Sequence, residues 1–346
     1  MLYCPAKEHT QGSMSIKSII VSCLCCESSL LAAPPQFSEA WVVLHANQGV
    51  SLTGGLSDRN KVFEVDREKY VLHTLENDSE LHMMIEVGEK GVGPKVLASF
   101  PEKQLVLKEY IKDSTITPEL AQHHCKEIGR SLKVAHEIPL LKEEGEGFEK
   151  ANRTRWEYIQ TQAAQQRTEL SSALLREAEE AMHVFEKGMK SLHELNSDLQ
   201  VNLHTDLHPR NLFWSEGRFL MIDWESCSHG HPYFDLASLS IFLGLDRLQE
   251  KELLEGYFGR APTSEQLQEY TLVKRIRWAY TSMVNTMWAF RVMEKEPVSE
   301  DIKPPERSFK DCMQFFAETD GMPPLNFFVD VSRLAHREAL LGESAL

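Results

Sequence analysis

Three oxygen-bearing side chains near the middle of the chain have the types and the spacing that phosphoryl transfer requires. The segment from His204 to Asn211 has the form H-x-D-x-x-x-x-N, with Asp206 at its third position. The residues after Asn211 read as a β-hairpin that ends at Asp223. Because paired strands lie about 5 Å apart, this hairpin is expected to place Asp223 beside Asn211.

Each of these residues has a chemical role in that arrangement. Asp206 can orient the attacking hydroxyl and accept its proton, and Asn211 and Asp223 can supply oxygen ligands to Mg²⁺. The alternative is that each polar residue only caps a turn, which would be the better interpretation for any one of them taken alone. The ordered set with its hairpin favours a catalytic site.

The same residues resemble a known family. The run from His204 to Asn211, followed by Ile222-Asp223-Trp224-Glu225, is similar to the signature of the aminoglycoside-phosphotransferase and choline-kinase superfamily. The resemblance covers roughly residues 50–242. It implies an α+β, protein-kinase-like fold of two lobes, with ATP and Mg²⁺ as cofactors. The His208-Pro209 step, the Asp-Trp-Glu ending and the lack of a downstream Ala-Pro-Glu segment favour the small-molecule branch over protein kinases.

A glycine-rich segment resembles the loop with which this family covers the nucleotide phosphates. Gly54 and Gly55 allow close backbone approach, and Ser57 can donate a hydrogen bond to a phosphate oxygen. Asp58 stands where the family usually has asparagine. An ordinary hairpin loop is the alternative interpretation.

The resemblance also assigns residues around the nucleotide. His73 occupies the strand position of the family's phosphate-binding lysine or arginine, and Glu80 matches the glutamate that pairs with this cation. A neutral imidazole carries no fixed charge, although Glu80 would favour its protonated form if the two were close. The alternatives are a surface histidine and a solvated carboxylate. Glu109 and Ile111 occupy the hinge, where backbone groups pair with adenine in the family.

Asp235 precedes an apolar helical segment, where it either caps that helix or holds the catalytic loop, as a matching aspartate does in the family. Both interpretations remain open from the sequence.

The substrate position is less defined. Choline kinases have tryptophan-bearing C-terminal helices, and here Trp278 and Trp288 could box a cationic substrate, with Glu225 facing the same cation. Core packing is the alternative, because ten residues place the two rings about 80° apart on a helix. We expect a cationic amino alcohol such as choline or ethanolamine. Thiamine, aminoglycosides and sugars remain open, as do a protein-directed kinase and a kinase-like nucleotide-binding protein with impaired catalysis.

The elements that must position these residues fall into three parts. Residues 1–39 are expected to be an N-terminal helical extension, residues 40–111 a nucleotide-binding lobe, and residues 112–346 a helical catalytic and substrate-binding lobe. Within the first lobe, Trp41 to His45 is predicted as one of several strands and Glu80 to Glu89 as a helix. In the last lobe, Leu174 to Leu192 carries a long apolar stripe.

Composition limits the partners. The 346 residues carry a net charge of −15 and contain no basic run. This charge argues against nucleic acid as a partner and is compatible with a cationic substrate.

The seven scattered cysteines indicate a reducing compartment such as the cytoplasm, and the cluster of Cys23, Cys25 and Cys26 lacks a second ligand pair for zinc. The stretch from Ile16 to Pro34 has an apolar core, Ile19 to Cys26, that is far shorter than the roughly 20 residues that a bilayer requires. It is interpreted as an amphipathic helix in preference to a signal peptide, and Met14 is an alternative start. The oligomeric state is left open.

Overall fold

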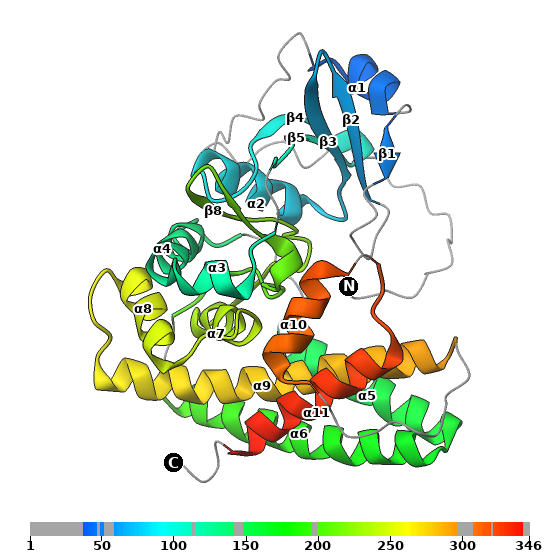
Figure 1. The fold of residues 1–346 in the computed structure, drawn as a ribbon, viewed down its shortest axis with the longest axis vertical. Coiled ribbons are helices and arrows are strands. Elements are labelled where there is room, and N and C mark those ends of the chain that lie inside the picture. The colour runs from blue at the N-terminus through cyan, green and yellow to red at the C-terminus, as the bar shows by residue number, and fades with distance from the viewer. Residues whose placement is uncertain are drawn as a thin grey trace, which may run out of the picture.

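The computed structural model describes residues 37–46, 49–51, 59–112, 115–141, 148–195, 199–295, 307–319 and 321–341. These residues form two lobes: a small one built on an antiparallel sheet and a larger one that is mostly helical (Figure 1). The predicted α+β, two-lobe architecture is therefore confirmed. The first 36 residues, which contain the cysteine cluster and the apolar stretch, lie outside the described part of the chain. Within that part, no helix has the length and apolar character needed to span a bilayer.

The small lobe contains five strands in the order β1-β2-β3-β5-β4, and every neighbouring pair is antiparallel. The strands are β1 (Val50–Ser51), β2 (Asn60–Val65), β3 (Glu68–Thr74), β4 (Val96–Phe100) and β5 (Leu105–Glu109). Asp66 and Arg67 join β2 to β3, and both have positive φ, as a two-residue hairpin turn of the right twist requires.

Two helices cover opposite faces of this sheet. α1 (Glu39–Ala46) packs through Val42 against Phe63, Leu72 and Leu107. On the other face, α2 (Asp78–Glu89) packs through Leu81 and Met84 against alternate residues of the same strands. The segment 41–45, predicted as a strand, is thus helical. A short apolar run fits either element, and here it covers a sheet face instead of extending the sheet.

The large lobe is arranged around one long helix, α9 (Ser264–Met293), which packs against α5, α6, α7 and α11. The other helices are α3 (Pro118–Gln122), α4 (Cys125–His136), α5 (Phe148–Gln166), α6 (Glu169–Glu194), α7 (Tyr233–Phe242), α8 (Arg247–Phe258), α10 (Phe309–Glu318) and α11 (Leu325–Leu341). The apolar stripe predicted in α6 is buried along its whole length. Side-chain capping boxes start α6, α8, α9 and α10, which satisfies backbone N–H groups at their first turns.

Two short strand pairs lie in the large lobe near the small one (Figure 1). β6 (Val201–Leu203) pairs with β9 (Ser228–Gly230), and β7 (Leu212–Ser215) pairs with β8 (Arg218–Met221) as the predicted hairpin. The Met221 N–H donates to the Val92 carbonyl at 2.9 Å, which ties this hairpin to the end of α2. The loops at the ends of these strands therefore face the junction of the lobes.

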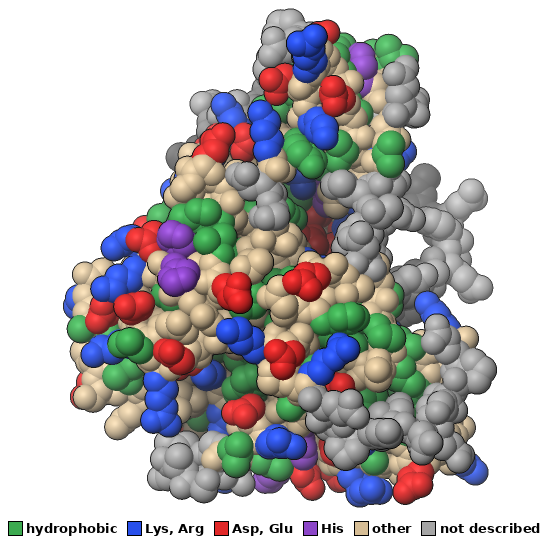
Figure 2. All heavy atoms as spheres, in the orientation of Figure 1, with side chains coloured by type: hydrophobic (Ala, Val, Ile, Leu, Met, Phe, Trp, Pro, Cys, Tyr) green, Lys and Arg blue, Asp and Glu red, His purple; other side chains and the backbone are tan. Residues whose placement is uncertain are grey.

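The molecular surface is hollowed at that junction, and acidic side chains are visible inside the hollow (Figure 2). Elsewhere on this face, acidic and basic side chains are interspersed over both lobes.

Candidate active site

The loop between β6 and β7 carries Asp206 and Asn211, and its last three residues form a short 3₁₀ turn. The Asn211 amide donates from Nδ2 to the Asp206 carbonyl at 3.0 Å and lies 3.4 Å from the Asp206 carboxylate. In the adjacent hairpin, Leu212 pairs with Met221, and the Ile222 N–H donates to the Asn211 carbonyl at 3.0 Å. Asp223 therefore follows directly beside Asn211. The three residues singled out by the sequence are brought together.

His204 connects the two loops that carry the acidic residues. Its ring is buried, Nε2 lies 2.8 Å from the Ile222 carbonyl, and Nδ1 accepts from the Asp206 N–H at 3.3 Å. Because Nδ1 is an acceptor, Nε2 carries the proton and donates it to the carbonyl. One imidazole thus fixes the spacing between the Asp206 loop and the residue before Asp223.

Asp235 holds the backbone of the loop that carries Asp206. Its carboxylate accepts from the N–H groups of His204 and Thr205 at 2.7 and 3.0 Å, and it lies 3.1 Å from His136 Nε2. Burial opposes ionisation of Asp235, but these hydrogen bonds and the nearby imidazoles outweigh it and lower its pKa. Since α7 begins at Tyr233 and Asp235 lies within its first turn, the capping alternative is wrong.

The backbone at this site is strained at two positions. Thr205, just before Asp206, has φ 68°, and Asp223 itself has φ 70°. This left-handed conformation is unfavourable for a β-branched residue such as threonine, and each such position costs about 1–3 kcal/mol. The hydrogen bonds from Asp235 and His204 hold the strained loop in place. Residues in such conformations are concentrated at functional sites, where they aim a side chain that relaxed backbone would turn away.

Asp206 remains accessible: its side chain is 45% exposed and its carboxylate lies 3.5 Å from His208 Nε2. Desolvation opposes its charge, yet the contact with His208 and the nearby His204 lower its pKa below the ordinary value. Asp206 is therefore ionised at neutral pH and presents an acceptor to a hydroxyl group.

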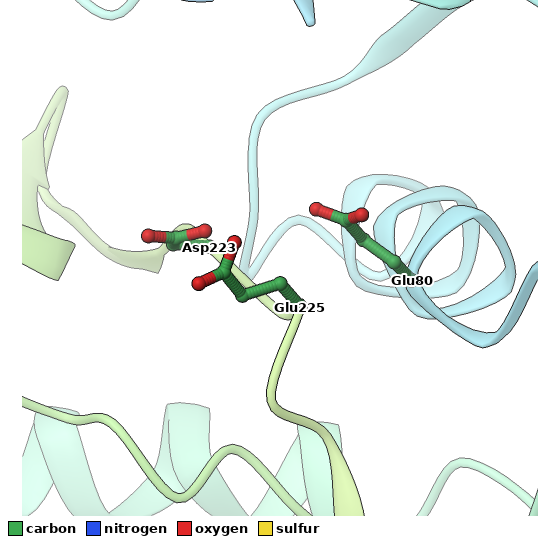
Figure 3. Close-up of side chains that lie close together, drawn as sticks. All are labelled: Glu80, Asp223 and Glu225. Carbon is green, nitrogen blue, oxygen red and sulfur yellow. The ribbon is translucent and has the colours of Figure 1, made fainter. Parts of the chain in front are cut away.

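Three carboxylates meet where the lobes face each other. Oxygen atoms of Glu80, Asp223 and Glu225 all lie within 4.8 Å of one another (Figure 3). Both oxygens of Glu80 are already engaged, one 2.8 Å from His73 Nε2 and the other accepting from the Glu76 N–H at 2.9 Å. Asp223 and Glu225 are thus the better placed metal ligands, and a set of hard oxygen donors suits Mg²⁺. Glu225 also forms an ion pair with Arg59 of the small lobe.

His73 and Glu80 are buried and paired, so the alternatives of a surface histidine and a solvated carboxylate are wrong. His73 Nδ1 lies 2.9 Å from Asn60 Oδ1, so both ring nitrogens are engaged. Burial lowers the pKa of His73, whereas the hydrogen bond to Glu80 and the charge of Glu80 raise it, and burial is the larger effect. A neutral ring can donate to only one of the two oxygen atoms, so the contacts with Asn60 and Glu80 favour the protonated form while burial opposes it.

A buried cation that the sequence did not reveal lies beside this pair. Lys108 on β5 is 6% exposed and pairs with Val71, while His73 pairs with Val106. Paired residues project to the same side, so Lys108 and His73 face α2 from neighbouring strands. Burial lowers the pKa of Lys108, and the charges of Asp223 and Glu80 oppose that shift. No described carboxylate comes within ion-pair distance of the Lys108 ammonium.

The remaining nucleotide residues are only partly described. Gly54, Gly55 and Ser57 lie outside the described residues. The Glu109 N–H donates to the Lys95 carbonyl at 3.0 Å, and Ile111 follows the end of β5 at the connection between the lobes. Their roles at the nucleotide stay predictions.

A cavity opens next to Asp206 within the large lobe, with about 1130 Å³ of space when the part open to solvent is included. Trp288 lines it, whereas Trp278 packs edge-on against Phe309, 4.7 Å between ring centres. The two tryptophans do not share a pocket, and Trp278 packs against the hydrophobic core, as the alternative interpretation held. Glu225 does not line this cavity either, since it lies with Asp223 on the small-lobe side.

A two-lobe fold with an aspartate, an asparagine and a carboxylate pair at the lobe junction defines a kinase-like phosphotransferase. Residues 49–270 match the model of the phosphotransferase enzyme family, and the chain belongs to that family. A comparison with curated protein sequences finds no match.

Solved structures share the fold at low sequence identity. The choline kinase of Streptococcus pneumoniae is 18% identical with a TM-score of 0.55, covering 86% of this chain and 93% of its own. The choline kinase of Cryptosporidium parvum is 15% identical with a TM-score of 0.56, covering 86% and 89%. A spectinomycin phosphotransferase, solved with ADP and spectinomycin, is 12% identical with a TM-score of 0.53, covering 85% and 93%.

Proposed function

We propose that this protein transfers the terminal phosphoryl group of ATP to a hydroxyl group of a small molecule. The observation that carries this proposal is the joining of two loops by His204, which holds Asp206 next to the hairpin that ends at Asp223. The nucleotide bound by the spectinomycin phosphotransferase supports ATP as the donor. Residues 40–111 would hold the nucleotide, and residues 112–346 would supply the catalytic loop and the acceptor cavity.

The chain's own groups divide the work. The Asp206 carboxylate orients the acceptor hydroxyl and takes its proton as the new oxygen–phosphorus bond forms and the bond to ADP breaks. Asn211, Asp223 and Glu225 are the residues that would hold Mg²⁺. When bound there, the ion neutralises charge on the phosphates. The ion pair with Arg59 involves one oxygen atom of Glu225, and the carboxylate has a second oxygen that could bind the ion.

The phosphate-binding cation of this site is Lys108 in our proposal. His73 stands at the family's lysine or arginine position, but its ring nitrogens are occupied by Asn60 and Glu80 and its pKa is lowered. Lys108 faces the same side of the sheet, within range of the charges of Asp223 and Glu80. Lys108, one strand away, offers an ammonium group that lies at ion-pair distance from no described carboxylate.

The test is thermal stabilisation of the purified protein by ATP with and without Mg²⁺, followed by an ATP-consumption screen over candidate alcohols. Mg²⁺-dependent stabilisation together with turnover on one alcohol class would support the proposal. Absence of any nucleotide-dependent stabilisation would contradict it. Stabilisation without turnover on any alcohol would point to a nucleotide-binding protein with impaired catalysis.

The acceptor class is not determined by the fold. The neighbouring choline kinases support the predicted amino alcohols, choline or ethanolamine, and the spectinomycin phosphotransferase supports an aminoglycoside. Thiamine is a further candidate. The described cysteines Cys125, Cys227 and Cys312 are free thiols, in keeping with the predicted cytoplasmic location.

A further inference from the structure

Two buried arginines line the cavity beside Asp206. Arg155 of α5 is 9% exposed and Arg277 of α9 is 3% exposed. Each guanidinium lies 4.7 Å from the ring centre of Tyr280, so the two cations flank one aromatic ring. Among the described residues that line the cavity, Asp206 is the only acidic one and His208 is the only histidine. Two arginines and one carboxylate therefore give the cavity an excess of positive charge.

The two arginines differ in what holds them. Arg277 donates from Nη2 to the Thr205 carbonyl at 3.1 Å, which places it against the residue before Asp206. Burial lowers the pKa of Arg277, but a guanidinium titrates so far above neutral pH that it stays charged. Arg155 has its Nε and Nη1 atoms buried without a hydrogen-bond partner among the described residues. Such donors are costly to bury unless a ligand satisfies them.

Tyr280 and Trp288, two aromatic residues of the cavity wall, already face cations. Tyr280 lies under both arginines, and the Arg291 guanidinium is 4.7 Å from the Trp288 ring centre. A cationic acceptor in this cavity would meet two fixed positive charges and find one carboxylate, which the reaction itself uses. An anionic group would instead find two guanidiniums whose planar donors match carboxylate or phosphate oxygens.

Charge balance within the fold accounts for only one of the two residues. Arg277 lies near the negative charges of Asp206 and Asp235 and can serve as their counter-charge. Arg155 forms no ion pair with a described acidic residue, so charge balance within the fold does not explain it.

We propose that the acceptor is a hydroxylated molecule with an anionic group, carboxylate or phosphate-like, which Arg155 and Arg277 bind while its hydroxyl faces Asp206. The apolar part of the acceptor lies against Phe242, Trp288 and Phe328 on the remaining wall. This inference rests on the proposed kinase function and specifies its substrate class.

The experiment uses four probes with the same phenyl carbinol body: mandelate, its phosphonate analogue, mandelamide and 2-amino-1-phenylethanol. Binding of each to the protein loaded with a non-hydrolysable ATP analogue is measured by thermal shift and calorimetry. Loading by the nucleotide is checked first, which separates failure of the kinase proposal from failure of this one. We expect an anionic probe to bind at least about tenfold more tightly than the amide, and the amine most weakly. The better of the two anions identifies carboxylate or phosphate as the preferred group.

Arg155→Met should reduce affinity for the preferred anion about 10- to 100-fold and leave the amide nearly unchanged, because it removes charge and keeps a long apolar side chain. Arg155→Lys, which keeps the charge, provides a second variant should the first fold poorly, and it should show a partial loss. Arg153→Met on the exposed side of the same helix is the matched control and should change nothing. If neither anion binds better than the amide, if the amine binds best, or if both Arg155 variants keep wild-type anion preference, the inference is overturned.

Discussion

Lys108 and His73 lie on neighbouring strands and face the same side of the small-lobe sheet, where the charge of Glu80 acts on both. The histidine is engaged by Asn60 on one side and Glu80 on the other, whereas the lysine has no described partner at ion-pair distance. In our proposal, the cation that contacts the nucleotide phosphates therefore lies one strand away from the position that the family's sequence pattern indicates.

Lys108→Met should therefore weaken binding of ATP about 10- to 100-fold and leave binding of adenosine, which has no phosphates, within about twofold. Calorimetric titration with both ligands measures the difference. Adding His73→Lys to this variant should restore part of the ATP affinity. Lys61→Met, which changes an exposed side chain of β2, serves as the control. Equal loss for ATP and adenosine would mean that Lys108 only supports the fold.

Asp206→Asn should lower kcat about 10²- to 10⁴-fold, because the hydroxyl loses the group that accepts its proton. ATP affinity should remain within about threefold, since Asp206 faces the acceptor cavity. Asp223→Ala should instead weaken ATP binding in the presence of Mg²⁺ and have little effect in its absence. Steady-state kinetics together with calorimetry separate the two patterns, and wild-type turnover in Asp206→Asn would remove its assigned role.

Glu225→Gln should raise the Mg²⁺ concentration at which ATP gives half of its maximal stabilisation, because a neutral amide is a weaker ligand than a carboxylate. Thermal shift against a Mg²⁺ series measures this concentration. Glu216→Gln, on the exposed turn between β7 and β8, is the matched control. If Glu225→Gln left the Mg²⁺ dependence unchanged, Glu225 would not be a metal ligand and would serve only to pair with Arg59.

Because of Asp235, the folding stability of the protein should depend on pH in the acidic range. Its pKa is lower in the folded protein than its ordinary value of 3.8, so it contributes stability above that value and loses it as pH falls through the folded pKa. Asp235→Asn should cost about 3 kcal/mol at neutral pH, because the buried His136 and loop N–H groups lose a charged partner. The difference between wild type and variant should shrink below about pH 4. Urea unfolding across this range tests it, and a constant difference would contradict it.

Gly129→Ala should destabilise the protein although alanine favours helices. A Cβ at this position of α4 would lie 2.1 Å from the Leu253 carbonyl oxygen of α8, and backbone atoms cannot move aside easily. The clash should outweigh the gain of about 1 kcal/mol in helix propensity. Gly188→Ala is the comparison, because there the nearest atoms belong to the Ile276 side chain, which can shift. Thermal unfolding should show the larger loss for Gly129→Ala.

Local patterns in the sequence were sufficient for much of the site. Asn211 and Asp223 flank one hairpin, so their proximity follows from strand pairing, and Asp206 precedes Asn211 by five residues in the same loop. His73 and Glu80 lie on a strand and the helix that follows it, and their pairing was likewise predictable. The buried stripe of α6 followed from its helical period.

Other parts depended on contacts between distant segments. Trp41 to His45 is helical because it covers a sheet face, and an apolar run of that length does not distinguish a helix from a strand. Trp278 and Trp288 share one helix, yet only Trp288 reaches the cavity, since α10 packs over Trp278. Asp235 lies close to His136 only because α4 and α7 meet in the folded chain.

The sequence by itself determined that a base, an amide and a carboxylate would meet on one β-turn-β unit, because neighbouring residues on paired strands have no freedom to separate. Only the tertiary structure decided which cations are buried near that unit. Lys108 lies on a strand and Arg155 and Arg277 lie on helices, and packing against distant segments buries all three side chains. Packing between distant segments determines which charged side chains are removed from water, and local sequence patterns do not predict this.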